Sequence, residues 1–194
     1  MAVEDYERVR VETREEWRRW LAENHASSPG AWLVSWKAAT GRPAVGYDAA
    51  VEEALCFGWI DSLAKTVDHE RSRQLFTPRR PGSRWSRSNR ERVERLLAAG
   101  AMEAAGLAAV ETAKASGAWS ELEAVESLIV PDDLAAAFAA HPGSSEHWES
   151  FPASVRRGLL QWILDAKRPE TRARRIAATA AEAAAGRRAG QWGR

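Results

Sequence analysis

Residues 59–77, WIDSLAKTVDHERSRQLFT, decide the fold class of this chain. The runs 59–67 and 71–77 are rich in residues that favour strands, and the polar residues 68–70 separate them. Two strand-forming runs joined by a short polar connection predict a β-hairpin. We therefore expect the sheet of this protein to be built around this hairpin.

A third strand is predicted upstream of the hairpin, over residues 31–38. Successive side chains of a strand point to opposite faces, so this run divides into two sets. One face carries Trp32, Val34 and Trp36, and the other carries Leu33, Ser35 and Lys37. The alternation indicates a strand with a Trp-rich face and a face that becomes polar toward its end.

Capping signals and helical spacing of apolar residues predict helices in the rest of the chain. Thr13 with Glu16 and Ser88 with Glu91 form capping boxes, and Asp48 is placed to cap a short helix. The predicted helices cover residues 13–25, 48–56, 88–100, 102–117, 131–143, 144–150, 155–167 and 169–186.

These elements predict an α+β fold, with a small, mostly antiparallel sheet and covering helices, followed by an all-helical C-terminal half. We expect an α+β domain over residues 1–100 that carries the functional site. A helical region over residues 101–186 is expected to pack on it, and residues 187–194 are expected to form a frayed tail.

Composition excludes several classes of protein. The 28 Lys and Arg residues against 27 Asp and Glu leave a formal net charge of +1, unlike a globally basic, histone-like protein. Residues 1–20 are too charged for a secretory signal, and no run reaches the roughly 18 apolar residues of a membrane span. The single cysteine cannot form an internal disulfide. We therefore predict a cytoplasmic protein with no membrane span.

The arginines are concentrated in one stretch, residues 71–95, which holds nine of them against Glu91 and Glu94, a local charge of +7. This density favours binding of an anion. The alternative is a solvated helix face on which the two glutamates pair with Arg95 and Arg90.

Within this stretch, the candidate ligand-binding residues are Arg79, Arg80, Trp85, Ser86 and Asn89. Guanidinium groups present planar donors that suit carboxylate or phosphate. The indole adds an aromatic face, and the serine and asparagine add neutral hydrogen bonds.

A second candidate constellation consists of Lys37, Trp59 and Asp61. If strand 59–67 pairs beside strand 31–38, the lysine and the aspartate lie on one sheet face near the indole ring. That arrangement predicts a charged pocket with an aromatic wall. The alternative is a structural ion pair with Trp59 in the core.

No metal or cofactor is predicted. None of the four histidines stands at a metal-ligand spacing, and the glycine-rich nucleotide-binding motifs are absent. Cys56 lies at the end of an apolar predicted helix, which indicates a buried and unreactive thiol.

Two strings carry a family resemblance: YDAAVEEALCFGWID at Tyr47–Asp61 and FTPRRPGSRWSRSNRERVERL at Phe76–Leu96. They resemble the YdeI/OmdA family of bacteriocin-protection or OmpD-associated proteins. Further motifs of the resemblance lie at residues 100–102, 113–119, 130–131 and 166–172, so it extends along nearly the whole chain. It implies a protection-type role without a defined reaction. Periplasmic placement is sometimes attached to that family name and is not carried over, because we find no export signal.

Three functional hypotheses follow. In the first, the chain binds a small anionic or aromatic molecule or a peptide. Trp59 and Trp85 would stack the ligand, Lys37, Arg79 and Arg80 would hold its anionic part, and Asp61 or Asn89 would orient it. In the second, the chain is an enzyme with Asp61 as general acid/base and Lys37 or an arginine stabilising negative charge. In the third, it binds nucleic acid through residues 71–95. The oligomeric state stays open.

Overall fold

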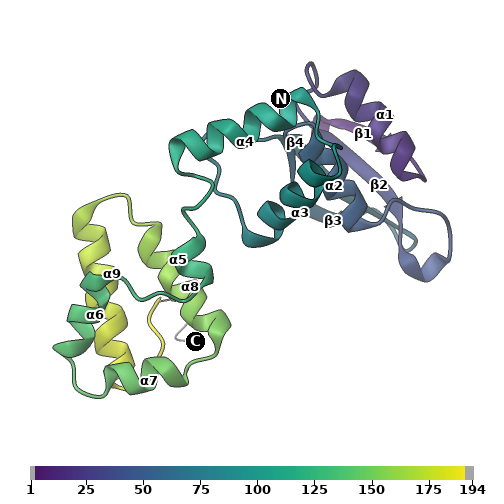
Figure 1. Cartoon of the computed structure of the whole chain (residues 1–194). Helices are drawn as coiled ribbons and strands as arrows, with labels where there is room; N and C mark the ends of the chain where they lie inside the picture. Colours follow the sequence, from purple (N-terminus) through teal and green to yellow (C-terminus); the bar gives the residue numbers. More distant parts are fainter. Residues whose placement is uncertain (1–2, 191–194) are drawn as a thin grey trace. The chain divides into compact units, whose positions relative to one another are not determined.

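The computed structural model describes residues 3–190 and confirms the predicted α+β class (Figure 1). Its strands are β1 (Glu7–Arg10), β2 (Ala31–Trp36), β3 (Trp59–Thr66) and β4 (Arg71–Pro78). The α-helices are α1 (Arg14–Asn24), α2 (Tyr47–Cys56), α3 (Arg87–Ala98), α4 (Ala104–Ser116), α5 (Glu123–Glu126), α6 (Asp132–Ala139), α7 (Ser144–Ser150), α8 (Ala153–Leu164) and α9 (Pro169–Ala184). Two 3-10 turns, η1 (Val3–Asp5) and η2 (Ala38–Thr40), complete the described elements. Within residues 3–190, no helix is both long and apolar enough to span a membrane.

The chain divides into two compact units, the first ending at Ser120 and the second beginning at Glu121. The first unit holds the sheet and helices α1 to α4. It therefore includes α4, which the sequence analysis assigned to the helical region after residue 100. The second unit is entirely helical in its described part.

The sheet has four strands in the order β1-β2-β4-β3. The predicted hairpin of β3 and β4 is present, and β4 also pairs antiparallel with β2. Strand β1 was not predicted; it pairs parallel with β2 through the crossover helix α1. Strand β3 is irregular between Asp61 and Ala64, where the pairing register with β4 shifts.

Asp68 closes the turn of the hairpin. Its carboxylate accepts hydrogen bonds from the backbone N–H groups of Glu70 and Arg71 and from the Arg71 guanidinium. Because the Arg71 guanidinium and these amides favour the charged carboxylate, the pKa of Asp68 is lowered to about 2. The polar residues between the two strands are thus the means by which the hairpin reverses direction.

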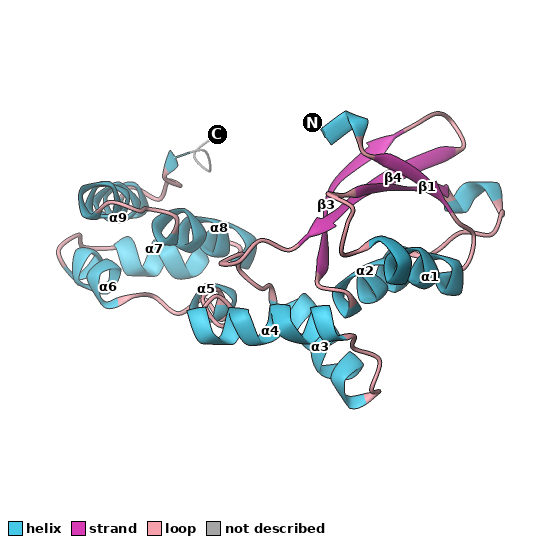
Figure 2. Cartoon of the chain, turned by 90° about the horizontal axis from the view of Figure 1, so that it is seen from above, coloured by secondary structure: helices cyan, strands magenta, loops and turns pink. Residues whose placement is uncertain are grey.

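Helices α1 and α2 cover one face of the sheet (Figure 2). This face contributes Ala31, Leu33 and Phe76 to a core that also contains Trp17 and Leu21 of α1. The alternation in strand 31–38 explains this sidedness, because Trp32 lies on the opposite face and does not belong to that core.

The opposite face is covered by cationic side chains. The guanidinium carbon of Arg73 lies 4.1 Å from the ring centroid of Trp32, whose indole N–H donates to the carbonyl of Val3 at 2.8 Å. Glu4 pairs with both Arg73 and Lys65 across this face. Long cationic side chains bury apolar surface along their stems, so Trp32 is fully buried although α1 and α2 pack on the other face.

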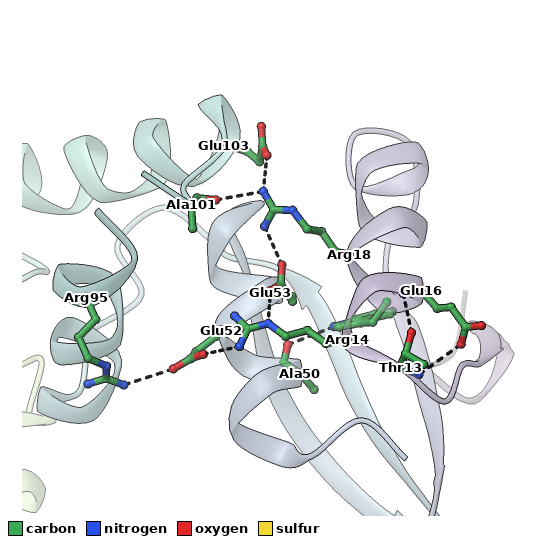
Figure 3. Close-up of polar contacts among 11 residues, drawn as sticks. Thr13, Arg14, Glu16, Arg18, Ala50, Glu52, Glu53, Arg95, Ala101 and Glu103 are labelled. Carbon is green, nitrogen blue, oxygen red and sulfur yellow. Dashed lines mark hydrogen bonds and ion pairs between the residues drawn. The ribbon is translucent and has the colours of Figure 1, made fainter. Parts of the chain in front are cut away.

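An ion-pair network fixes α2 against α1 (Figure 3). The predicted capping box of Thr13 and Glu16 starts α1. From this helix, Arg14 and Arg18 both pair with Glu53 of α2, whose side chain is only 5% exposed. Arg18 also reaches Glu103, immediately before α4. A nearly buried carboxylate needs such partners, and here they join three helices.

The capping of α2 and α3 differs from the prediction. Gly46 is the N-cap of α2, and Asp48 lies inside the first turn. The N-cap of α3 is Ser86, whose hydroxyl accepts from the N–H of Asn89, and not Ser88. In both cases the N-cap lies two residues before the predicted cap, at a residue type that also suits this position.

The second unit has a core of its own, in which Trp148 and Phe138 lie 5.3 Å apart between ring centroids. The short helix α5 was not predicted. Within the predicted tail, Ala189 is buried in this core and Arg187 pairs with Glu182, whereas fraying itself stays a prediction. Residues 191–194 of that tail lie outside the described residues.

Candidate functional site

A cavity of about 560 Å³ opens on the helix-facing side of the sheet; we call it the sheet cavity. It lies beside β2 and β4, under the loop that connects β2 to α2. It is lined by Leu33, Ser35, Trp36, Lys37, Ala38, Arg42, Ala44, Val45, Gly46, Tyr47, Ala50, Ala64, Ser72, Arg73, Gln74 and Phe76.

The sequence explains why space remains here. Toward the end of β2 the inward set changes from apolar Leu33 to small Ser35, and its partner on β4 is Ser72. Small side chains at these paired positions cannot fill the volume in front of the sheet. The chain then leaves the sheet through a turn-rich segment, residues 37–46, whose backbone borders the cavity.

Two cationic residues, Lys37 and Arg42, line this cavity and are only partly engaged. The ammonium of Lys37 donates to the carbonyl of Asp68 at 2.8 Å, which leaves two of its N–H groups for a ligand. The guanidinium of Arg42 lies over the Trp36 ring at 4.2 Å and forms a loose pair with Glu70 at 3.6 Å. Arg73 also contributes to the wall, but its guanidinium is engaged with Glu4. None of the described residues that line the cavity is acidic.

Asp61 forms hydrogen bonds with two residues that line the cavity, Tyr47 and Gln74. Its Oδ2 accepts the Tyr47 hydroxyl at 2.8 Å and the Gln74 amide at 3.4 Å, whereas Oδ1 has no partner among residues 3–190. Burial raises the pKa of Tyr47, and the hydrogen bond to the Asp61 carboxylate raises it further. Tyr47 therefore stays a neutral donor through the physiological range.

The predicted neighbourhood of Lys37 and Asp61 is wrong. It required β3 to lie beside β2, but β4 lies between them. In the described part of the chain the two side chains form no ion pair: Lys37 binds a carbonyl of the hairpin turn, and Asp61 binds Tyr47 and Gln74.

Trp59 belongs to the core. It is 1% exposed, its indole N–H donates to the carbonyl of His25, and its ring meets that of Trp20 edge-on at 5.9 Å between centroids. The Trp59 ring therefore offers no face to a ligand in this structure. This agrees with the alternative interpretation, in which Trp59 is a core residue. Cys56 is also buried, and burial raises the pKa of its thiol.

Arg79, Arg80 and Trp85 lie together at a second cavity of about 180 Å³, which we call the loop cavity. Arg79 stacks on the Trp85 ring, with 3.7 Å from the guanidinium carbon to the ring centroid. Trp85 is 1% exposed, so this stacking places the arginine and not the indole at the cavity surface. Helix α4 provides the facing wall, and the lining residues are Arg79, Arg80, Pro81, Gly82, Ser83, Trp85, Ala108, Ala109, Thr112 and Ala113.

Ser86 and Asn89 line neither cavity and are engaged in helix α3. The Ser86 hydroxyl caps the helix, and the Asn89 side-chain oxygen accepts from Arg92. The predicted site is therefore divided: Lys37 lies at the sheet cavity, and the two arginines and Trp85 lie at the loop cavity.

Most arginines of the basic stretch 71–95 are neutralised or otherwise engaged. Arg71, Arg73, Arg92 and Arg95 form ion pairs. Arg79, Arg84, Arg87 and Arg90 also have partners. Of the nine arginines in this stretch, only Arg80 has a side chain that forms neither a hydrogen bond nor an ion pair with a described residue. Charge density along the sequence therefore overstated the free positive surface, which removes the main support for nucleic-acid binding through this stretch.

Sequence reasoning missed Trp36, Arg42, Tyr47 and Gln74 as site residues. Tyr47 opens one of the two family-like strings, and Arg42 lies in the turn-rich segment before it. Both signals were present, but their meaning depends on the loop folding over the sheet, which no local pattern shows.

Comparison with family models places the first unit in a family. Residues 9–109, just over half of the chain, match the model described as Domain of unknown function (DUF8412). The chain belongs to the DUF8412 family. Both cavities fall mostly within this match, so the DUF8412 region carries the candidate sites. No curated protein and no solved structure matches the chain.

A second match covers residues 127–186, with the model described as Bacteriocin-protection, YdeI or OmpD-Associated. The resemblance is thus supported for the second unit alone. The strings at Tyr47–Asp61 and Phe76–Leu96, on which it mainly rested, lie in the DUF8412 match. The motifs at residues 130–131 and 166–172 are the ones inside the second match.

Proposed function

We propose that this DUF8412-family chain binds a small anionic molecule with an aromatic part in the sheet cavity. The observation that carries the proposal is a concave wall with two incompletely engaged cations, Lys37 and Arg42, and no acidic residue among the described lining residues. Small-molecule pockets commonly measure about 300–1,000 Å³, so a volume of about 560 Å³ suits a metabolite or one side chain of a peptide.

The wall supplies complementary contacts for such a ligand. Lys37 and Arg42 would bind its anionic group, and α2 begins at the cavity with a Gly46 N-cap, so its first amides add positive potential. The Tyr47 ring and the apolar lining residues Val45 and Phe76 provide apolar contact. Gln74 and the Tyr47 hydroxyl are fixed by Asp61, which pre-organises both side chains.

A protection-type role is the second part of the proposal. It is supported by the match of residues 127–186 to the bacteriocin-protection, YdeI or OmpD-associated model. In this role the chain would bind or sequester its small ligand. A cytoplasmic location and a contribution to resistance stay predictions.

The binding proposal is tested with a defined probe, the aromatic anion benzoate. Its titration into the full chain, followed by ¹⁵N-labelled backbone NMR spectra, is expected to shift amides of residues 37–47 in a saturable manner. Lys37→Gln and Arg42→Gln should each weaken this binding roughly tenfold, the effect of one lost charge-assisted hydrogen bond.

Lys65→Gln is the matched control. It removes one lysine charge on the other sheet face, where Lys65 pairs with Glu4, and should leave the benzoate affinity unchanged. If all three variants bind benzoate equally, or if the shifts do not saturate, the sheet cavity is not an anion site.

The enzymatic alternative is favoured by one observation: Asp61 Oδ1 has no partner within residues 3–190 while Oδ2 is held by Tyr47. A carboxylate fixed at one oxygen can accept a proton at the other. Turnover of a bound molecule that is lost in Asp61→Asn while binding is retained would support this function over binding alone.

A further inference from the structure

Arg79 is a largely buried cation without an acidic partner. In the described part of the chain no carboxylate forms an ion pair with it, and its Nη2 donates only to the carbonyls of Ser83 and Arg84. Its Nε is buried and has no hydrogen-bond partner among the described residues. A charge removed from water normally requires a counter-charge, and an unpaired buried donor carries its own desolvation penalty.

The Trp85 ring accounts for one side of the guanidinium. Stacking at 3.7 Å supplies a cation–π attraction but no hydrogen-bond acceptor for Nε. Burial consequently lowers the pKa of Arg79 to about 10, and the field of Asp61 opposes this shift without abolishing it. The loop is therefore built to hold a cation in place, and the charge of that cation is left uncompensated by the described residues.

Arg80 adds a second positive charge to the same cavity. Its side chain is exposed and makes no hydrogen bond or ion pair within residues 3–190, and it lines the loop cavity beside Arg79. The facing wall consists of small residues of α4, Ala108, Ala109 and Thr112, so the space next to the arginines stays open. A volume of about 180 Å³ is several times the roughly 30 Å³ share of one water molecule.

We propose that the loop cavity binds a phosphate group, with Arg79 and Arg80 as its ligands. Two adjacent guanidinium groups match the charge of about −1.5 to −2 that a phosphate group carries at neutral pH. A phosphate bound in the loop cavity supplies the counter-charge that Arg79 lacks among the described residues. This site is separate from the sheet cavity, since the two sets of lining residues have no member in common.

The first experiment observes Arg79 Nε–H directly by ¹⁵N NMR of the full chain. Titration with inorganic phosphate at constant ionic strength is expected to shift this resonance in a saturable manner, and Arg79→Lys, which lacks Nε, identifies the peak. Titration with glycerol 3-phosphate distinguishes free phosphate from a phosphomonoester: tighter binding of the ester indicates that the site reads a phosphate carried on a larger molecule.

Affinity for phosphate, measured by calorimetry, should fall roughly tenfold or more in Arg79→Gln and also fall in Arg80→Gln. Arg8→Gln removes an exposed arginine charge from β1 and should leave the affinity unchanged. Phosphate binding that is weakened equally by all three variants reflects net charge alone and overturns the proposal, as does the absence of saturable binding.

A second pair of variants tests the counter-charge without touching either arginine. Thr112→Glu places a carboxylate on the cavity wall, whereas Thr112→Gln places a neutral side chain of the same size there. We expect the glutamate variant to melt at a higher temperature than the glutamine variant at low salt, and to lose the stabilisation by phosphate. Equal melting temperatures with an unchanged phosphate response would show that Arg79 needs no anion.

Discussion

At the scale of single residues, the structure shows how environment decides the role of a side chain. Lys37 and Arg79 are both cations on the sheet-bearing unit, yet one keeps free donors at an open cavity and the other stacks on a buried indole. That both residues bind an anion stays a prediction. The sequence could indicate the chemistry of each residue, but the cavity to which each belongs depends on contacts between distant segments.

The Tyr47–Asp61 hydrogen bond gives a prediction about pH. The folded-state pKa of Tyr47 lies above its ordinary value of 10.0, so the hydrogen bond stabilises the fold below pH 10. This contribution is lost as the pH rises through the folded-state pKa. In a Tyr6→Phe background, where Tyr47 is the remaining tyrosine, tyrosinate absorbance should show that Asp61→Asn moves this pKa back toward 10.0.

Asp48→Asn serves as the comparison for this titration. Asp48 acts on Tyr47 only through its charge, more weakly than Asp61, so its variant should lower the pKa of Tyr47 by less. Equal shifts in the two variants would contradict a specific hydrogen bond to Asp61.

At the scale of elements, local sequence patterns predicted those structures that form between residues close together in the sequence. The hairpin and the capping box at Thr13 depend on such neighbours, and both were predicted correctly. Strand β1 was missed because Glu7-Arg8-Val9-Arg10 holds a single apolar residue, and its partner β2 lies more than twenty residues away. The position of β4 between β2 and β3 has the same long-range origin.

The contact between α2 and α4 gives a prediction about packing. A Cβ atom at Gly106 would lie 2.2 Å from the carbonyl oxygen of Cys56, the last residue of α2. Alanine normally favours a helix by about 1 kcal/mol over glycine, but here the clash should dominate. We expect Gly106→Ala to lower the free energy of unfolding by about 1–3 kcal/mol, measured with urea.

Gly46→Ala is the control for an added methyl group. No heavy atom lies within 4 Å of its Cβ position, and the N-cap glycine has a negative φ of −63°. Because glycine is preferred to alanine at an N-cap, a loss of about 0.5 kcal/mol is expected there, below the loss at Gly106. Similar losses in both variants would mean that close helix approach is not the reason for Gly106.

At the scale of the whole molecule, the chain consists of two units with separate cores. The core around Trp17 and Phe76 shares no residue with the core around Phe138 and Trp148. The two family matches follow the same division, with residues 9–109 in the first unit and residues 127–186 in the second. The chain thus joins two units that match different families. This explains why the family resemblance, which we expected along nearly the whole chain, is supported only for the C-terminal unit.

This division predicts that each unit folds alone. Fragments 1–120 and 121–194 should both show a cooperative thermal transition in circular dichroism, because each retains its complete core. Phosphate should raise the melting temperature of the first fragment only, since the loop cavity lies within it. A gradual, non-cooperative melt of either fragment would show that its stability depends on the other.

The margins of the sheet have a consequence for the behaviour of the protein in a crowded solution. The outermost strands are β1, with three charged residues among four, and β3, which carries Lys65 and an irregular register after Asp61. Short, charged or bent edges are poor templates for a strand from another copy. The folded first unit is therefore protected against amyloid-like stacking through its sheet, even though its interior strands hold the apolar runs that would otherwise promote it.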